Sequence, residues 1–162
     1  MTSANQIIKA RMRTNPIYWL ASGFGSGLVP YCPGTAGTLF AVPLVWGLQM
    51  LPTALFAAIT VLAFFFGLWI CRFVSDDLGV SDHPAIVWDE IVGYMVTMIA
   101  APEGFAWMAL GFGLFRFFDI LKPWPIRWID AHVSGGMGIM ADDVLAGACA
   151  SATIFLIDTG LG

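Results

Sequence analysis

A long run without any charged residue occupies much of the N-terminal half of this chain. Between Arg13 and Arg72 there is no Lys, Arg, Asp or Glu, and most of the run is apolar. Within it, residues 35–51 and 53–71 are each long enough, or nearly so, to cross ~30 Å of hydrocarbon as a helix. Pro52 separates the two segments and suits a tight turn. The run therefore predicts a helical hairpin in a membrane.

The composition of the whole chain agrees with a membrane location. Hydrophobic residues make up 59% and charged residues 11%, whereas globular proteins carry about 25% charged residues. A soluble domain of this composition would lack the polar side chains to cover its surface. The net charge of −4 and the lack of a basic stripe argue against nucleic-acid binding. We expect a single domain, residues 1–162, in contact with membrane lipids.

Three more apolar segments follow, separated by polar connectors. Residues 85–101 and 104–115 form a second predicted hairpin around Pro102, and residues 139–157 form a last single segment. Both segments of the second hairpin are short for a span, so tilt or local bilayer thinning is implied. The expected fold is an all-α, multi-pass transmembrane helical bundle of about five membrane segments. Residues 16–34 could be interfacial, re-entrant or a further short helix.

The positions of the basic residues predict how this bundle is oriented. Cytoplasmic loops of membrane proteins are enriched in Lys and Arg. If the N-terminus is cytoplasmic, the two hairpins return the chain to the cytoplasm, and all basic residues share that side. These residues are Lys9, Arg11, Arg13, Arg72, Arg116, Lys122 and Arg127. The opposite side then carries only the acidic Glu103 and Asp158 and the C-terminus.

Two pairs of adjacent carboxylates stand at the start of apolar segments. Asp89 and Glu90 follow a His-Pro turn, and Asp142 and Asp143 follow a glycine-rich stretch. One explanation is that acidic side chains favour the N-terminal end of a helix dipole. However, ionisable residues in apolar segments are costly and commonly functional, and facing carboxylates repel unless a cation lies between them. Oxygen ligands suit Mg²⁺, so these four residues are the expected metal ligands and catalytic carboxylates.

Between the two pairs lies a stretch that could bind phosphate. Arg116 and Asp119 are three residues apart and share a helix face, so an intrahelical ion pair explains them simply. Pro123 ends the helix and leaves Lys122 and Arg127 on a constrained turn, well placed to hold a phosphate. We expect the three cations to neutralise phosphate charge, with Asp119 orienting Arg116 at the catalytic site.

A glycine-rich segment, residues 23–38, has two explanations that its spacing supports equally. Glycines in membrane proteins often serve helix packing. Gly34-Thr35 and Gly37-Thr38, however, come just before an apolar helix, and a helix N-terminus with hydroxyl groups can bind an anion. On the second explanation Thr35 and Thr38 belong to the phosphate site. The segment lacks the Lys of a P-loop.

The absence of several phosphatase motifs limits the possible mechanisms. Cys32 is followed by no Arg at the spacing of a cysteine phosphatase, no Asp-x-Asp motif occurs, and His83 and His132 do not fit the histidine lipid phosphatases. Direct attack by water is favoured, and a carboxylate nucleophile stays open. A cation or proton transporter is the alternative from another class, but it would need carboxylates distributed through the membrane depth. A non-catalytic membrane subunit would not need these ordered ionisable motifs.

Four segments of the chain resemble phosphatidylglycerophosphatase A. They are GFGSGLVPYCPGTAGTL (23–39), HPAIVWDEIVG (83–93), FRFFDILKPWPIRWID (115–130) and GGMGIMADDVLAG (135–147). The resemblance implies a Mg²⁺-dependent enzyme of the bacterial cytoplasmic (inner) membrane that removes the terminal phosphate of phosphatidylglycerophosphate to give phosphatidylglycerol. It agrees with the predicted sidedness, because that headgroup is made facing the cytoplasm. A homo-oligomer is compatible with these features.

Overall fold

The computed structural model describes residues 3–80 and 83–161, which form helices and turns without any strand. The helices are α1 (Ser3–Met12), α2 (Pro16–Ala21), α3 (Pro33–Gln49), α4 (Thr53–Leu78), α5 (Trp88–Met98), α6 (Phe105–Leu121), α7 (Ile126–His132) and α8 (Gly135–Leu161). A 3-10 turn, η1 (Ser26–Leu28), precedes α3. The predicted all-helical class is confirmed.

Both predicted hairpins are present, with turns where the sequence placed them. Pro52 caps the start of α4, three residues after α3 ends. The second turn joins α5 to α6 around residues 99–104. However, α5 is shorter than the predicted segment 85–101. The residues before it form a turn, because the Val87 N–H donates to the Ala21 carbonyl, 2.8 Å away, instead of continuing a helix.

The length of the helices does not confirm five membrane segments. In the described part of the chain, two helices, Thr53–Leu78 and Gly135–Gly160, are long and apolar enough to cross a membrane. The 11 residues of α5 rise only ~16 Å at 1.5 Å per residue, against ~30 Å of hydrocarbon. The 17-residue α3 and α6 rise ~25 Å each. Residues 16–34 contain the six-residue α2, the turn η1 and the first two residues of α3, so this range has no helix long enough to span.

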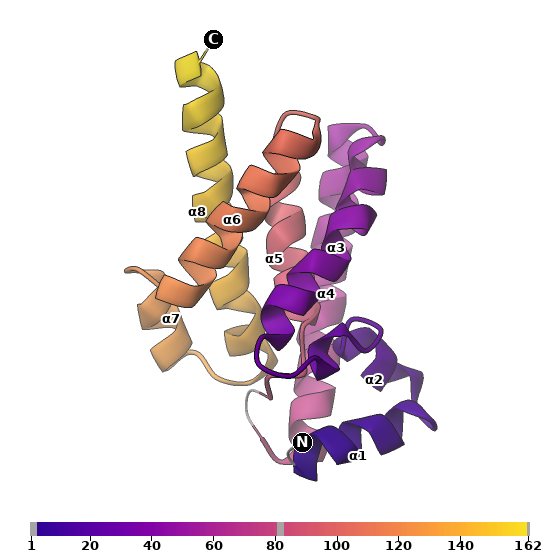
Figure 1. Ribbon diagram of the computed structural model, residues 1–162. Helices are drawn as coiled ribbons and strands as arrows, with labels where there is room; N and C mark the ends of the chain where they lie inside the picture. Colours follow the sequence, from indigo (N-terminus) through magenta and orange to yellow (C-terminus); the bar gives the residue numbers. More distant parts are fainter. Residues whose placement is uncertain (1–2, 81–82, 162) are drawn as a thin grey trace.

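The centre of the molecule is α5, which packs against α3, α4, α6 and α8 (Figure 1). Its side chains Ile91, Tyr94, Met95 and Met98 are all buried. The Tyr94 hydroxyl donates to the Met108 carbonyl of α6 at 2.9 Å, so this buried polar group keeps a partner. The core of the bundle is therefore built around α5.

The crossing of α5 and α8 depends on two glycines. Gly93 and Gly147 face each other so closely that a Cβ at position 147 would collide with the Gly93 carbonyl oxygen. The Thr97 hydroxyl donates to the Gly93 carbonyl at 3.0 Å and lies 3.4 Å from that of Gly147. Close backbone approach at small residues is the usual way that helices pack in membranes.

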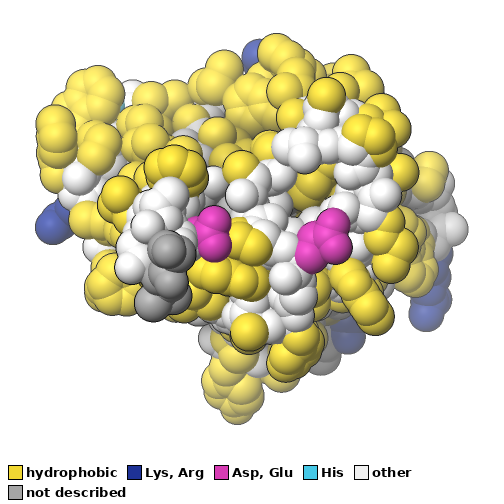
Figure 2. All heavy atoms as spheres, turned by 90° about the horizontal axis from the view of Figure 1, so that it is seen from above, with side chains coloured by type: hydrophobic (Ala, Val, Ile, Leu, Met, Phe, Trp, Pro, Cys, Tyr) yellow, Lys and Arg dark blue, Asp and Glu magenta, His cyan; other side chains and the backbone are white. Residues whose placement is uncertain are grey.

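The two ends of the bundle differ in character. In Figure 1 the C-terminus and both hairpin turns lie at the upper end, and α1, α2 and α7 lie at the lower end. At the lower end, α2 is held to α4 by the buried Tyr18, whose hydroxyl donates to Asp77, and Arg11 of α1 lies 3.5 Å from the same carboxylate. Figure 2 looks onto the upper end, where acidic side chains stand apart among apolar ones and the visible Lys and Arg lie at the rim.

Candidate active site

A cavity of about 500 Å³ opens among the charged residues at the lower part of the bundle. Its walls come from the start of α3 (residues 31–35), the start of α5, the C-terminal part of α6, and α8. The sequence-predicted residues that line it are Thr35, Asp89, Glu90, Arg116, Asp119, Lys122, Asp142 and Asp143. Four helices therefore bring together eight of the ten predicted site residues.

Three carboxylates in this cavity form a compact cluster. One oxygen each from Asp89, Glu90 and Asp143 lies within 4.8 Å of the other two. Asp89 and Asp143 are buried. Among the described residues, Oε2 of Glu90 and Oδ1 of Asp143 have no hydrogen-bond partner. Buried carboxylate oxygens that face one another without donors are costly unless a cation neutralises them, so this donor set fits a hard divalent ion such as Mg²⁺.

The glycine crossing explains why these carboxylates meet. Asp89 stands four residues before Gly93 on α5, and Asp143 stands four residues before Gly147 on α8. Four residues are about one helical turn, so each carboxylate lies one turn from the point where the two backbones touch. Asp89 and Glu90 lie in the first turn of α5, where the helix dipole also favours them.

The second acidic pair is placed differently from the prediction. Helix α8 begins at Gly135, so Asp142 and Asp143 lie about two turns inside it, beyond the reach of the terminal dipole. Oδ2 of Asp142 lies 2.6 Å from Nζ of Lys122, which is also 2.6 Å from Oδ1 of Asp130. Asp142 is thus the partner of a cation, and the compact cluster excludes it.

Lys122 stands where α6 ends. Its backbone is left-handed, with φ of 43°, and Pro123 follows, so the helix ends where the prolines predicted. Burial lowers the pKa of the Lys122 ammonium, but its hydrogen bonds to Asp130 and Asp142 outweigh that effect and leave the pKa above its usual value. Lys122 therefore carries its charge at any physiological pH.

The predicted ion pair between Arg116 and Asp119 is present, and both side chains are largely buried. Nε of Arg116 has no hydrogen-bond partner within the described ranges. Gly34, in the first turn of α3, lies against both charged groups of this region. A Cβ there would collide with Oε1 of Glu90 and come within 3.1 Å of the Arg116 guanidinium. Gly34 thus lets the start of α3 close over the charged centre.

The two threonines and the remaining arginine of the predicted phosphate site lie in three different places. Thr35 lines the cavity. Thr38 is fully buried and donates to the Gly34 carbonyl of its own helix at 2.9 Å, so its hydroxyl serves α3. Arg127 is exposed and lies at a neighbouring cavity between α6 and α7.

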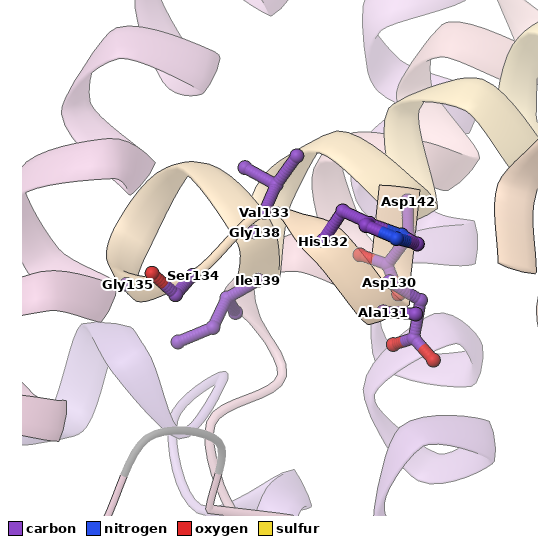
Figure 3. A pocket seen from close by; sticks show the side chains of 9 residues that line it. All are labelled: Asp130, Ala131, His132, Val133, Ser134, Gly135, Gly138, Ile139 and Asp142. Atoms are coloured by element: carbon purple, nitrogen blue, oxygen red, sulfur yellow. The ribbon is translucent and has the colours of Figure 1, made fainter. Parts of the chain in front are cut away.

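Asp130 is a site residue that the sequence did not reveal. It lies eight residues beyond Lys122, across two prolines, at a spacing that no single helix or turn would pair. A smaller cavity of about 220 Å³ lies between α7 and the start of α8. Figure 3 shows Asp130, His132 and Asp142 on one side of it and Ser134 on the other. Asp142 lines both cavities, so α7 adjoins the active-site region.

Two known proteins that are similar in sequence to this chain share one family name. Residues 19–158 match the family model of phosphatidylglycerophosphatase A. The chain is 44% identical to phosphatidylglycerophosphatase A of Escherichia coli K12 over 93% of its own length and 89% of that protein. It is 45% identical to the Haemophilus influenzae protein of the same name, over 97% of both chains.

The chain belongs to the phosphatidylglycerophosphatase A family. Membership makes it a phosphatase, as the resemblance of its four motifs predicted. A Bacteroides thetaiotaomicron relative, 41% identical over 79% of this chain and 84% of its own, is named provisionally as a phosphatidylinositol-3-phosphatase. No solved structure matches the chain.

Proposed function

We propose that this protein hydrolyses the terminal phosphate of phosphatidylglycerophosphate, using Mg²⁺, to give phosphatidylglycerol and inorganic phosphate. One observation carries the proposal: the carboxylate cluster of Asp89, Glu90 and Asp143 shares a cavity with the cations Arg116 and Lys122. Carboxylates suited to a metal beside cations suited to phosphate are the elements that phosphoryl transfer needs. The family's name supplies the substrate.

The metal would be held by Asp89, Glu90 and Asp143. When bound, Mg²⁺ neutralises charge on the phosphoryl oxygens and lowers the pKa of a water molecule. The unpartnered oxygens of Glu90 and Asp143 are suitable ligand atoms. Asp142, which pairs with Lys122, would act beside the metal.

The other residues of the cavity would bind and orient the terminal phosphate. Arg116 presents its planar guanidinium, oriented by Asp119, and Lys122 presents a point charge held between Asp130 and Asp142. Gly34 and Thr35 line the same cavity, where the Thr35 hydroxyl and the first N–H groups of α3 would serve as donors. Water attacks phosphorus, the bond from phosphorus to the glycerol oxygen breaks, and that oxygen leaves as the alcohol of phosphatidylglycerol.

We place the protein in the bacterial cytoplasmic membrane as a multi-pass protein with its active site on the cytoplasmic side. Helices α4 and α8 have the length to span, and α3, α5 and α6 would be shorter helices held within the bundle. Large apolar side chains such as Leu62, Phe65 and Leu156 are more than half exposed on α4 and α8, as expected where lipid covers the protein. The basic residues lie on or next to α1, on α7 and near the C-terminal ends of α4 and α6, away from the hairpin turns, as expected of cytoplasmic loops.

The test is phosphate release by the purified protein in detergent micelles. The expected result is release of one phosphate per molecule of phosphatidylglycerophosphate, and a much slower reaction with phosphatidylinositol 3-phosphate, the substrate that one relative's name carries. A protein that releases no phosphate from phosphatidylglycerophosphate under any Mg²⁺ concentration would overturn the proposal.

A further inference from the structure

A third cavity, of about 510 Å³, lies between the end of α6 and α7. We call it the α6–α7 groove. Its walls include Leu121, Trp124 and Trp128, and the charged residues at its edge are Lys122 and Arg127. Arg127 was predicted to belong to the phosphate site, but it lines this groove and not the cavity of the carboxylate cluster.

The groove combines an apolar wall with positive charge. Leu121, Trp124 and Trp128 are 61%, 83% and 55% exposed, and the Trp128 ring stacks on His132 with ring centres 4.8 Å apart. Among the residues that the structure describes, no Asp or Glu lines the groove. In the part of the chain that the structure describes, Arg127 forms no ion pair. An unpaired guanidinium beside exposed indoles suits a phosphate that carries a hydrocarbon chain.

Lys122 connects this groove to the active-site cavity, because it lines both. The proposed substrate has two phosphates joined through one glycerol. The terminal phosphate is removed, and the inner phosphodiester carries the diacylglycerol. When the terminal phosphate lies beside Arg116, the inner phosphate and the acyl chains therefore leave the active-site cavity on one side. The α6–α7 groove adjoins the active-site cavity and offers a cation and an apolar wall to these parts of the lipid.

We infer that the α6–α7 groove binds the inner phosphodiester and the first part of the acyl chains of the lipid substrate. This inference rests on the proposed function. Arg127 contacts the phosphodiester, and Trp124 and Trp128 flank the chains where they enter the membrane. The product keeps the inner phosphodiester and both chains, so it occupies the groove as the substrate does, whereas inorganic phosphate does not.

Binding of phosphatidylglycerol tests the inference without requiring turnover. The purified protein in uncharged detergent micelles is titrated with phosphatidylglycerol, and binding is followed by tryptophan fluorescence. Arg127→Gln should raise the Kd about tenfold or more, the loss expected for one charge-assisted hydrogen bond. Arg13→Gln, which removes an exposed arginine outside both cavities, should leave the Kd unchanged. Diacylglycerol, which has the acyl chains but no phosphodiester, should bind the parent and Arg127→Gln equally weakly.

A kinetic measurement separates this inference from the proposed function. Arg127→Gln should raise the KM for phosphatidylglycerophosphate by the same factor and leave inhibition by inorganic phosphate at the parent's Ki. An Arg127→Gln variant that binds phosphatidylglycerol and substrate as tightly as the parent overturns the groove as a lipid site. A parent that binds phosphatidylglycerol through Arg127 but releases no phosphate supports the groove and overturns the proposed function.

Discussion

Gly93 of α5 and Gly147 of α8 touch backbone to backbone, and each stands four residues after a carboxylate of the candidate metal site. A Cβ on Gly147 would meet the carbonyl oxygen of Gly93, which is part of the main chain and cannot rotate away. The separation of the two helices at this point therefore sets the distance between Asp89 and Asp143. The active-site geometry depends on two residues that have no side chain.

Gly147→Ala should consequently reduce activity far more than an ordinary helix substitution. Forcing the helices apart should cost about 1–3 kcal/mol of stability, and displacing a metal ligand by about 1 Å should lower the rate roughly 100-fold. Thermal unfolding and phosphate release in detergent measure the two effects. Gly113→Ala on α6, where a Cβ would meet nothing within 4 Å, is the matched control and should keep the parent's rate. Equal activity of both variants would contradict the role of the crossing.

Lys122→Met should destabilise the protein by a similar amount at pH 7 and at pH 9. The raised pKa of Lys122 in the folded state means that its ion pairs stabilise the fold fully below the unfolded pKa of about 10.4. This stabilisation is lost only as the pH rises through the still higher folded pKa. Removing the ammonium leaves the largely buried Asp142 without its partner, at a cost of about 1–3 kcal/mol.

Thermal unfolding of Lys122→Met and the parent at the two pH values is the measurement. Arg13→Met removes an exposed cation and should change stability by less than about 0.5 kcal/mol. A destabilisation by Lys122→Met that is present at pH 7 and absent at pH 9 would show that Lys122 loses its charge between these values, contrary to the direction of its pKa.

The orientation in the membrane can be tested with single cysteines at the two ends of the bundle. In a background lacking Cys32, Cys71 and Cys149, Glu103→Cys should react with an impermeant thiol reagent in intact spheroplasts. Asp76→Cys, also exposed, should react only after the membrane is permeabilised. The opposite pattern would place the active site outside the cytoplasm. The C-terminal Gly162, predicted to lie on the same side of the membrane as Glu103, is outside the described residues.

The sequence was sufficient for the features that depend on local chemistry. Pro52 predicted the first hairpin turn, Pro123 predicted the end of α6, and the three-residue spacing of Arg116 and Asp119 predicted their ion pair. Each follows from the backbone of one segment or from neighbours on one helix. The residue types of the carboxylate cluster were evident for the same reason, since adjacent acids in apolar segments stand out.

Features that depend on packing between distant segments were not accessible in this way. The pairing of Asp142 with Lys122, and of Lys122 with Asp130, is set by the position of α7 against α8. The contact of Gly34 with Glu90 requires α3 and α5 to pack together. The late start of α5 depends on a hydrogen bond from Val87 to Ala21, which are far apart in sequence. The assignment of metal ligands among the four carboxylates stays a prediction.

Asp89, Glu90 and Asp143 are proposed to hold the Mg²⁺ on which hydrolysis depends. The most direct test is the Mg²⁺ dependence of phosphate release from phosphatidylglycerophosphate, measured for the parent, Asp143→Asn and Asp142→Asn, with the exposed Asp158→Asn as control. Chelation should abolish the parent's activity, and Mg²⁺ should restore it better than Ca²⁺. Asp143→Asn should lose at least about 100-fold in rate, because the metal supplies several kcal/mol of charge stabilisation. The Mg²⁺ concentration that gives half-maximal activity should be the same for Asp142→Asn as for the parent. Full parental activity in excess chelator would contradict a role for Mg²⁺. An Asp143→Asn variant that keeps at least about half the parent's turnover, a loss of under 0.5 kcal/mol, would contradict Asp143 as a metal ligand.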